Sequence, residues 1–300
     1  MGRKALESHW HDVGFSPAPV GIHQRLGLAA CLALLAGCSS SVANVQPARI
    51  TPAGHWQVNG AISVTPPRAM PGASLDAVRA IDDELSGNPS AEELEAVGEA
   101  ATAALVQPPS GDGHVALSYG VNRRLELGAR IGPTNAGAGF RLQWLRRSPG
   151  IYGVIGARAL IGFNDFPVER FADEVRIESF RRYDFAFPLH LGYSGRVVHL
   201  WAGPQLMVSR FSSDVAICLD DADVCRQEAM VGTSGRATYL TGQMGIALGK
   251  RRFWIAFELN ISRLRINADV DLRMGTRRII TNHQQSGRVI TPSLGFIAWF

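Results

Sequence analysis

The sequence predicts an all-β protein, a ten-stranded antiparallel up-and-down transmembrane β-barrel with a helical hairpin inserted in its first long connection. Three observations predict this fold. Apolar and polar residues alternate with period two along ten segments. Most of these segments have the length with which a tilted strand crosses a bilayer, about 9–11 residues. Tight turns alternate with longer connections, as in a meander of membrane strands.

The first residues are typical of an export signal. Arg25 precedes the short apolar stretch Leu26–Ala36, which is too short to span a bilayer as a helix. The residues Leu35, Ala36, Gly37 and Cys38 resemble a bacterial lipobox. That resemblance implies a signal peptide over 1–37, acyl chains such as palmitate on Cys38, and a lipidated N-terminal linker over 38–53. Ser39 then favours retention at the outer membrane. A plain signal peptide with an unmodified cysteine is the alternative.

The β-barrel is expected over residues 54–300. One segment, 251–266, shows the pattern best, because Phe253, Ile255 and Phe257 alternate with Trp254 and Glu258. Single-chain bacterial barrels have an even number of strands, which favours counting the weaker first segment. The ten segments are 54–65, 113–121, 124–132, 137–146, 151–163, 182–193, 196–209, 236–249, 251–266 and 287–300.

Alternation alone does not say which face meets lipid, because a soluble barrel such as a lipocalin buries its apolar face inside. Glycines recur on the polar face, for example Gly128, Gly203 and Gly245, and a narrow lumen has room for them. The chain ends in Leu294–Phe300, with an aromatic last residue. This ending resembles the C-terminal insertion signal of outer-membrane β-barrel proteins. The resemblance implies outer-membrane lipid and the barrel-assembly machinery as partners, and a location in the cell outer membrane, lipid-anchored and integral.

If the apolar face points outward, the polar face lines a lumen that contains both charges. These residues could line a pore or bind an anion. They could instead neutralise one another and fill a narrow barrel. The predicted lumen cluster consists of Glu126, Arg130, Arg141, Arg158, Asp184, His190, His199 and Glu258.

Two connections carry further features. Residues 74–107 have helical spacing and a capping-box pattern, Ser90 with Glu93, which predicts the helical insert. This acidic insert either packs over the barrel mouth or remains a solvated loop. Cys218 and Cys225, in a connection expected over 210–235, predict a disulfide in an oxidising compartment. A calcium site at the neighbouring aspartates is a weaker alternative, because the distal Glu of an EF-hand is missing.

The sequence contains no catalytic, nucleotide-binding or metal motif, so we expect no enzyme, no cofactor, no metal and no nucleic-acid partner. A structural, surface-interaction or narrow-pore role is expected. One alternative is an outer-membrane hydrolase with its site on the extracellular rim, although the acids and histidine expected in loops lack the pair motif of omptin-type proteases. The other is a soluble periplasmic barrel that binds an apolar ligand. The loop residues considered are Asp165, Asp173, Asp220, Asp221 and His283.

Overall fold

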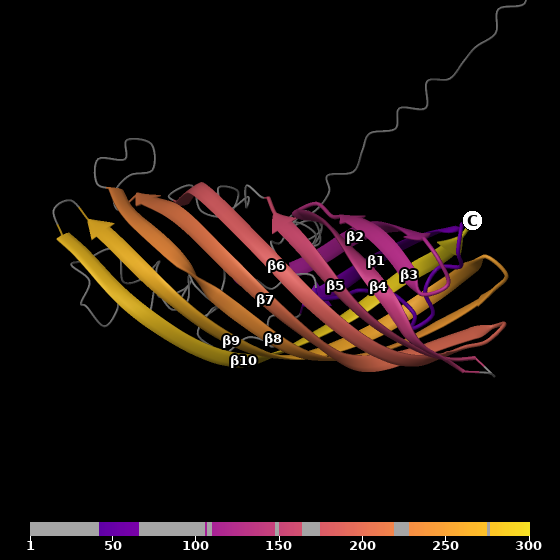
Figure 1. Cartoon of the computed structure of the whole chain (residues 1–300). Coiled ribbons are helices and arrows are strands. Elements are labelled where there is room, and N and C mark those ends of the chain that lie inside the picture. Colours follow the sequence, from indigo (N-terminus) through magenta and orange to yellow (C-terminus); the bar gives the residue numbers. More distant parts are fainter. Residues whose placement is uncertain are drawn as a thin grey trace, which may run out of the picture.

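The computed structural model describes residues 42–65, 106, 110–147, 150–163, 175–218, 228–274 and 277–300. Ten antiparallel strands form one closed ring in which each strand pairs with its sequence neighbours (Figure 1). They are β1 (Trp56–Thr65), β2 (Ser110–Gly120), β3 (Leu125–Ile131), β4 (Asn135–Arg147), β5 (Ile151–Gly162), β6 (Val175–Ser194), β7 (Val198–Cys218), β8 (Glu228–Lys250), β9 (Phe253–Met274) and β10 (Arg277–Trp299).

The ring closes between the first and last strands. β1 pairs with β10 from Gln57 opposite Trp299 to Ser63 opposite Ser293. The ten-stranded antiparallel prediction is therefore confirmed, including its weakest segment. Closure pairs the backbone groups that two open sheet edges would otherwise expose.

Several predicted features lie outside the described residues. These are the signal peptide, Cys38, Cys225, the four loop aspartates and the helical insert except for Val106. The predicted disulfide and helical hairpin therefore remain predictions. Among the described residues, no helix is long and apolar enough to cross a bilayer.

The strands of one side are much longer than predicted. β6 to β10 contain 20 to 23 residues each, and in Figure 1 they reach well past β1–β5. The expected connection over 210–235 is therefore wrong, because Cys218 is the last residue of β7. The expectation that His283 lies in a loop is also wrong, because it belongs to β10. We call the part of β6–β10 beyond the short strands the distal wall.

Along the long strands, the apolar side changes from the outer face to the inner face. On β9, Phe257 is 47% exposed and Glu258 is fully buried, as the predicted outward apolar face requires. Beyond Ile261 the pattern inverts, because Arg263 is exposed whereas Leu264 is buried. The same inversion separates Arg288 from Ile290 on β10. The distal wall is thus built like a soluble sheet, with its apolar side inward, and this inversion explains why alternation underestimated the strands.

Two buried apolar clusters occupy the interior. One, towards the distal wall, includes Val42, Val106, Met207, Tyr239 and Leu264. The other, near the tight turns, includes Val45, Trp201, Trp254 and Ile297. Gly245 lies under the indole of Trp201, where a β-carbon would collide with the ring. Polar groups occupy the layer of the lumen between these clusters.

Candidate functional site

The structure places the eight residues of the predicted lumen cluster on the inward face, and seven of them are buried. Arg158 is partly buried. Glu126 on β3 accepts hydrogen bonds from Nε and Nη2 of Arg141 on β4, both 2.8 Å long. Glu126 and Arg141 are direct cross-strand partners, so the register of the ring creates this bidentate pair.

Two further ion pairs cross the lumen face, each with a partner that the sequence did not single out. Arg130 on β3 lies 3.3 Å from Asp112 on β2. Arg182 Nε donates to Asp184 on the same strand at 2.9 Å. Asp112 lay one residue outside the segment predicted over 113–121, whereas Arg182 was the first residue of the segment 182–193, so sequence patterning could have added Arg182 to the cluster. Three cations are thereby neutralised by acids in contact with them.

The lumen is filled by the N-terminal segment, residues 42–51, which the sequence predicted to be part of a linker. Val42 lies in the distal apolar cluster, whereas Thr51 donates its amide to Glu126 Oε2 at 2.6 Å near the tight-turn end. The segment therefore runs from the distal end of the lumen towards the tight turns. A turn at Pro52–His55 then leads into β1.

The backbone of the N-terminal segment is held by side chains from around the ring. The carbonyl oxygens of Val42, Ala43, Val45 and Pro47 accept hydrogen bonds from wall side chains, because an extended segment in a lumen cannot pair its own groups. The donors are Gln205 and Gln243 to Val42, Arg130 to Ala43, Asn59 to Val45 and Arg141 to Pro47.

Asn44 joins the fourth cation to the fourth acid. Arg158 on β5 and Glu258 on β9 lie four strands apart in the ring, so they face each other across the lumen. The side-chain oxygen of Asn44 accepts a 2.5 Å hydrogen bond from Arg158 Nη1, and its backbone amide donates to Glu258 Oε1 at 2.8 Å. Among the described residues the strands contribute four arginines and four acids to the lumen, and Asn44 completes the set.

A hydrogen-bonded chain continues from Glu258 around the wall. Its carboxylate also accepts from Trp201 Nε1 and from Asn260 at 3.0 Å. Asn260 accepts from Gln243, which contacts His190 through its amide oxygen. The buried carboxylate is thus satisfied by neutral donors, with Arg158 supplying the opposite charge at a distance.

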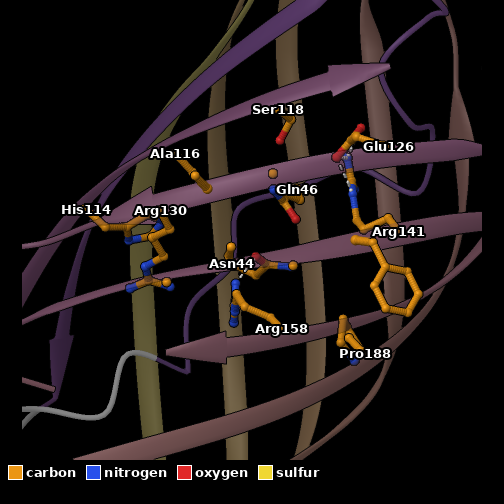
Figure 2. Close-up of a pocket in the computed structure, with 17 residues that line it drawn as sticks. Asn44, Gln46, His114, Ala116, Ser118, Glu126, Arg130, Arg141, Arg158 and Pro188 are labelled. Atoms are coloured by element: carbon orange, nitrogen blue, oxygen red, sulfur yellow. Dashed lines mark hydrogen bonds and ion pairs between the residues drawn. The ribbon is translucent and has the colours of Figure 1, made fainter. Parts of the chain in front are cut away.

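A small cavity remains between the N-terminal segment and β2–β5 (Figure 2). It measures about 40 Å³ and is lined by His114, Ser118, Arg130, Arg158 and Asn44, among others. Nε and Nη2 of Arg158, Nε of Arg130 and Nδ1 of His114 are buried here without a protein partner. Since a water molecule needs roughly 10–15 Å³ of such space, the cavity has room for a few waters that would satisfy these groups.

Val106 connects the first long connection to the lumen. It is the one described residue between β1 and β2, and it is fully buried. Its carbonyl oxygen accepts from Arg182 Nη1 at 2.9 Å and from the Tyr239 hydroxyl at 3.2 Å. The connection between β1 and β2 therefore returns to the inside of the distal wall before β2 begins.

The geometry offers little to a hydrolase. Ser194 Oγ contacts His199 Nδ1 beside the tight turn between β6 and β7. The His199 ring stacks on Trp254, with centroids 3.8 Å apart, and its Nε2 has no hydrogen-bond partner. A triad needs a carboxylate to orient the histidine. Among the described residues no acid contacts His199, and no group of three potential metal ligands is present.

Comparisons with known proteins give distant structural matches. No family model matches the chain, and no curated protein matches it. It is similar to solved structures of the RagAB peptide importer in the closed-closed state (TM-score 0.32, 8% identity) and the open-open state (TM-score 0.30, 8% identity). A RagAB peptide transporter structure gives TM-score 0.32 at 7% identity. These matches cover 82–84% of this chain, which spans about two fifths (40–41%) of theirs.

We predict that the buried pairs, unlike the exposed ones, dominate stability. Glu126→Gln leaves the Arg141 guanidinium uncompensated in the lumen, which should lower the free energy of unfolding by about 3–5 kcal/mol. Urea titration of the folded band on gels measures this. The control is Asp271→Asn on the exposed distal wall, where hydrogen bonds from Arg278 and Arg273 hold the carboxyl pKa well below its usual range. Equal midpoints for the two variants would contradict the prediction.

Proposed function

We propose that the chain is an integral outer-membrane β-barrel lipoprotein whose lumen is closed by its own N-terminal segment, and whose role is to present the distal wall at the cell surface. The observation that carries this proposal is the exchange of faces along the long strands. A wall that is apolar outside and charged inside suits a bilayer, whereas a wall with the opposite arrangement suits water.

The apolar part of the outer face has the dimension of a bilayer. On β9 the outward apolar positions run from Phe253 to Ile261, and on β10 from Ile290 to Ala298, which is a span of nine residues in each case. Tilted strands need about 9–11 residues to cross. The corresponding range on β6 runs from Tyr183 to Tyr193, with an aromatic residue at each end, as membrane interfaces favour. We call this zone the apolar band.

Charged residues border the apolar band on both sides. Exposed cations gather at the tight-turn end, including Arg123, Arg124, Arg146, Arg147, Lys250 and Arg251. Exposed arginines also begin directly above the band on the distal wall, for example Arg263 after Ile261. Both borders suit the phosphate layers of a bilayer.

The N-terminal segment supports a closed rather than an open barrel. It occupies the lumen from the distal cluster to the tight turns, and its Asn44 completes the charge balance between Arg158 and Glu258. At the tight-turn end the guanidinium of Arg49 lies 5.3 Å from the Trp299 ring. An open pore would require the segment to leave the lumen, and Arg158 and Glu258 would then lose the contacts that Asn44 provides.

The direction of the segment bears on the lipid anchor. Val42 lies beside Gln205 and Gln243, whose outward neighbours, such as Leu206, belong to the distal part of the apolar band. Four residues of chain lead from Cys38 to Val42 and span at most about 14 Å. Acyl chains on Cys38 would therefore enter the distal leaflet, on the cell-surface side if the tight turns face the periplasm.

The soluble alternative fits less well. A barrel that binds an apolar ligand needs an apolar lumen, but the middle of this lumen holds ion pairs and a segment of the chain itself. The hydrolase alternative would need a histidine oriented by an acid, and His199 contacts Ser194 without one among the described residues.

The membrane placement predicts a depth-dependent cost for a new charge. Phe257→Arg, in the middle of the apolar band, should destabilise insertion by about 2–4 kcal/mol. Ser234→Arg, on the outer face of β8 in the distal wall, should have little effect because that position is exposed and lies opposite Asp269. Heat-modifiable migration after folding into liposomes measures insertion. Equal tolerance of both arginines would overturn the proposed membrane placement.

The closed lumen predicts that the wild-type protein shows no steady conductance in a planar bilayer. Deletion of 42–50 should produce a stable ohmic conductance, because in the described part of the chain this segment fills the space between the lumen walls at the level of Asn44. Heat modifiability verifies that the deletion variant still folds. Asn44→Ala, which keeps the segment but removes one side-chain acceptor, serves as the intermediate variant. Identical conductance of wild type and deletion would contradict closure by this segment.

The anchor predicts a surface-exposed N-terminus. An epitope inserted between Ser41 and Val42 should bind antibody on intact cells, whereas one inserted in the turn at Ser194–Gly195 should bind only after permeabilisation. Labelling with palmitate should be lost in Cys38→Ser. The contrary result is a protein that is labelled with palmitate but whose epitope before Val42 is detected only in permeabilised cells. That result would place the anchor in the periplasmic leaflet and refute the direction inferred from the segment.

A further inference from the structure

A belt of five exposed arginines runs across the distal wall directly above the apolar band. Its members are Arg210 on β7, Arg236 on β8, Arg263 and Arg265 on β9, and Arg288 on β10. We call these residues the basic belt. The four strands are consecutive neighbours in the ring, so the belt is a continuous surface rather than scattered charges.

The register places like charges opposite each other in the basic belt. Arg210 is the direct cross-strand partner of Arg236, and Arg263 is that of Arg288. Arg265 lies opposite Thr238 and is therefore the diagonal neighbour of Arg236. Directly opposed like charges destabilise a sheet. The folded chain thus carries a repulsion that an anion would relieve.

The acids of the distal wall do not relieve it. Among the described residues, none of the five belt arginines forms an ion pair. Asp271 binds Arg273 and Arg278, at 2.6 Å and 2.8 Å, on the side of the belt away from the apolar band. Asp269, the diagonal neighbour of Arg236, accepts from Asn282, and Asp214 accepts from Ser179. Neither acid forms an ion pair with a belt arginine.

The surface next to the basic belt is apolar. Leu240, which is 58% exposed, is the cross-strand partner of Arg263. Ile261 and Ile290 are exposed partners of each other and lie two residues from Arg263 and Arg288 towards the tight turns. A ligand that satisfies both surfaces must combine anionic groups with hydrocarbon. Guanidinium groups bind phosphate oxygens in a bidentate manner, which a belt of arginines without lysine favours.

We propose that the basic belt binds the phosphate groups of outer-leaflet lipids, with their acyl chains against Leu240, Ile261 and Ile290. This proposal rests on the membrane placement proposed above and names its lipid partner. A free phosphate ion would use the arginines alone, and a glycolipid without phosphate would use the apolar surface alone. The proposed ligand is the lipid that carries both phosphate groups and acyl chains.

The test compares two acylated glucosamine disaccharides with the same chains, one with two phosphates and one with none. Full-length protein is purified in a non-ionic detergent free of phosphate, and lipid binding is counted by native mass spectrometry. Wild type should prefer the phosphorylated lipid by about tenfold or more, since charge-assisted hydrogen bonds are the strong ones. The Arg263→Gln/Arg288→Gln variant should lose most of that preference. An equal affinity of wild type for the two lipids would overturn the proposal.

The chain offers a matched control. Arg273 and Arg278 are also exposed cross-strand partners on β9 and β10, but both form ion pairs with Asp271. Arg273→Gln/Arg278→Gln should therefore keep the wild-type preference, although it removes the same charge from the same strands. Loss of preference in both variants would reduce the effect to net charge and overturn the site.

Three readouts separate the remaining explanations. Without phosphorylated lipid, the Arg263→Gln/Arg288→Gln variant should be at least as stable as wild type, because a repulsion is removed; a clear loss of stability would mean that the arginines are structural. Displacement of the lipid by inorganic phosphate alone would assign the belt to the free ion. If wild type enters phosphatidylcholine bilayers, as heat modifiability shows, but does not prefer the phosphorylated lipid, this inference alone is refuted. If wild type fails to enter any bilayer, the proposed function is refuted.

Discussion

Closure of β10 on β1 is the constraint on which the rest of the molecule depends. A closed ring has no edges, so each residue faces either the lumen or the surroundings, and successive residues of a strand alternate between the two. Once apolar residues such as Phe257 and Phe187 point outward, the charges between them must share a narrow interior. Three pairs between acids and arginines meet this demand within or between adjacent strands. The fourth requires a bridge, and the ring itself has no residue to provide it.

The N-terminal segment supplies that bridge and much else that the lumen lacks. Its carbonyl groups accept from Arg130, Arg141, Gln205 and Gln243, so donors that would face an empty lumen become part of a network. Leaving such groups buried and unsatisfied costs about 1–3 kcal/mol each. The segment and the wall therefore hold each other in place, and the segment acts as a plug of the lumen rather than as a linker.

Sequence patterning could predict the ring and the strand count from alternation and turns, and the glycines of the polar face and the C-terminal ending indicated the outward face. It underestimated β6–β10, because the distal wall keeps the same period while the apolar side turns inward, as Arg263 and Leu264 illustrate. Residues 42–51 were beyond its reach, since the segment has neither period nor motif and is held by side chains remote in sequence. One signal was available: within the predicted strands Glu258 has no basic residue on the polar face of either neighbouring strand, which indicates that its partner must come from elsewhere in the chain.

In the membrane placement proposed above, the exchange of faces also sets the position of the barrel along the membrane normal. Moving the barrel inward by two residues of strand would place Arg263 and Arg288 in hydrocarbon and would expose Phe253 at the tight-turn end to water. Moving it outward would draw the cations of the tight turns, such as Lys250, into hydrocarbon. The cost of an arginine rises steeply with depth and reaches about 2–4 kcal/mol at the midplane, so the transition on each long strand acts as a stop. Because β1–β5 end close to the band and only β6–β10 continue, this stop is one-sided. In the proposed placement the distal wall then lies above the membrane on one flank of the barrel, and Val106 packs against its inner apolar face.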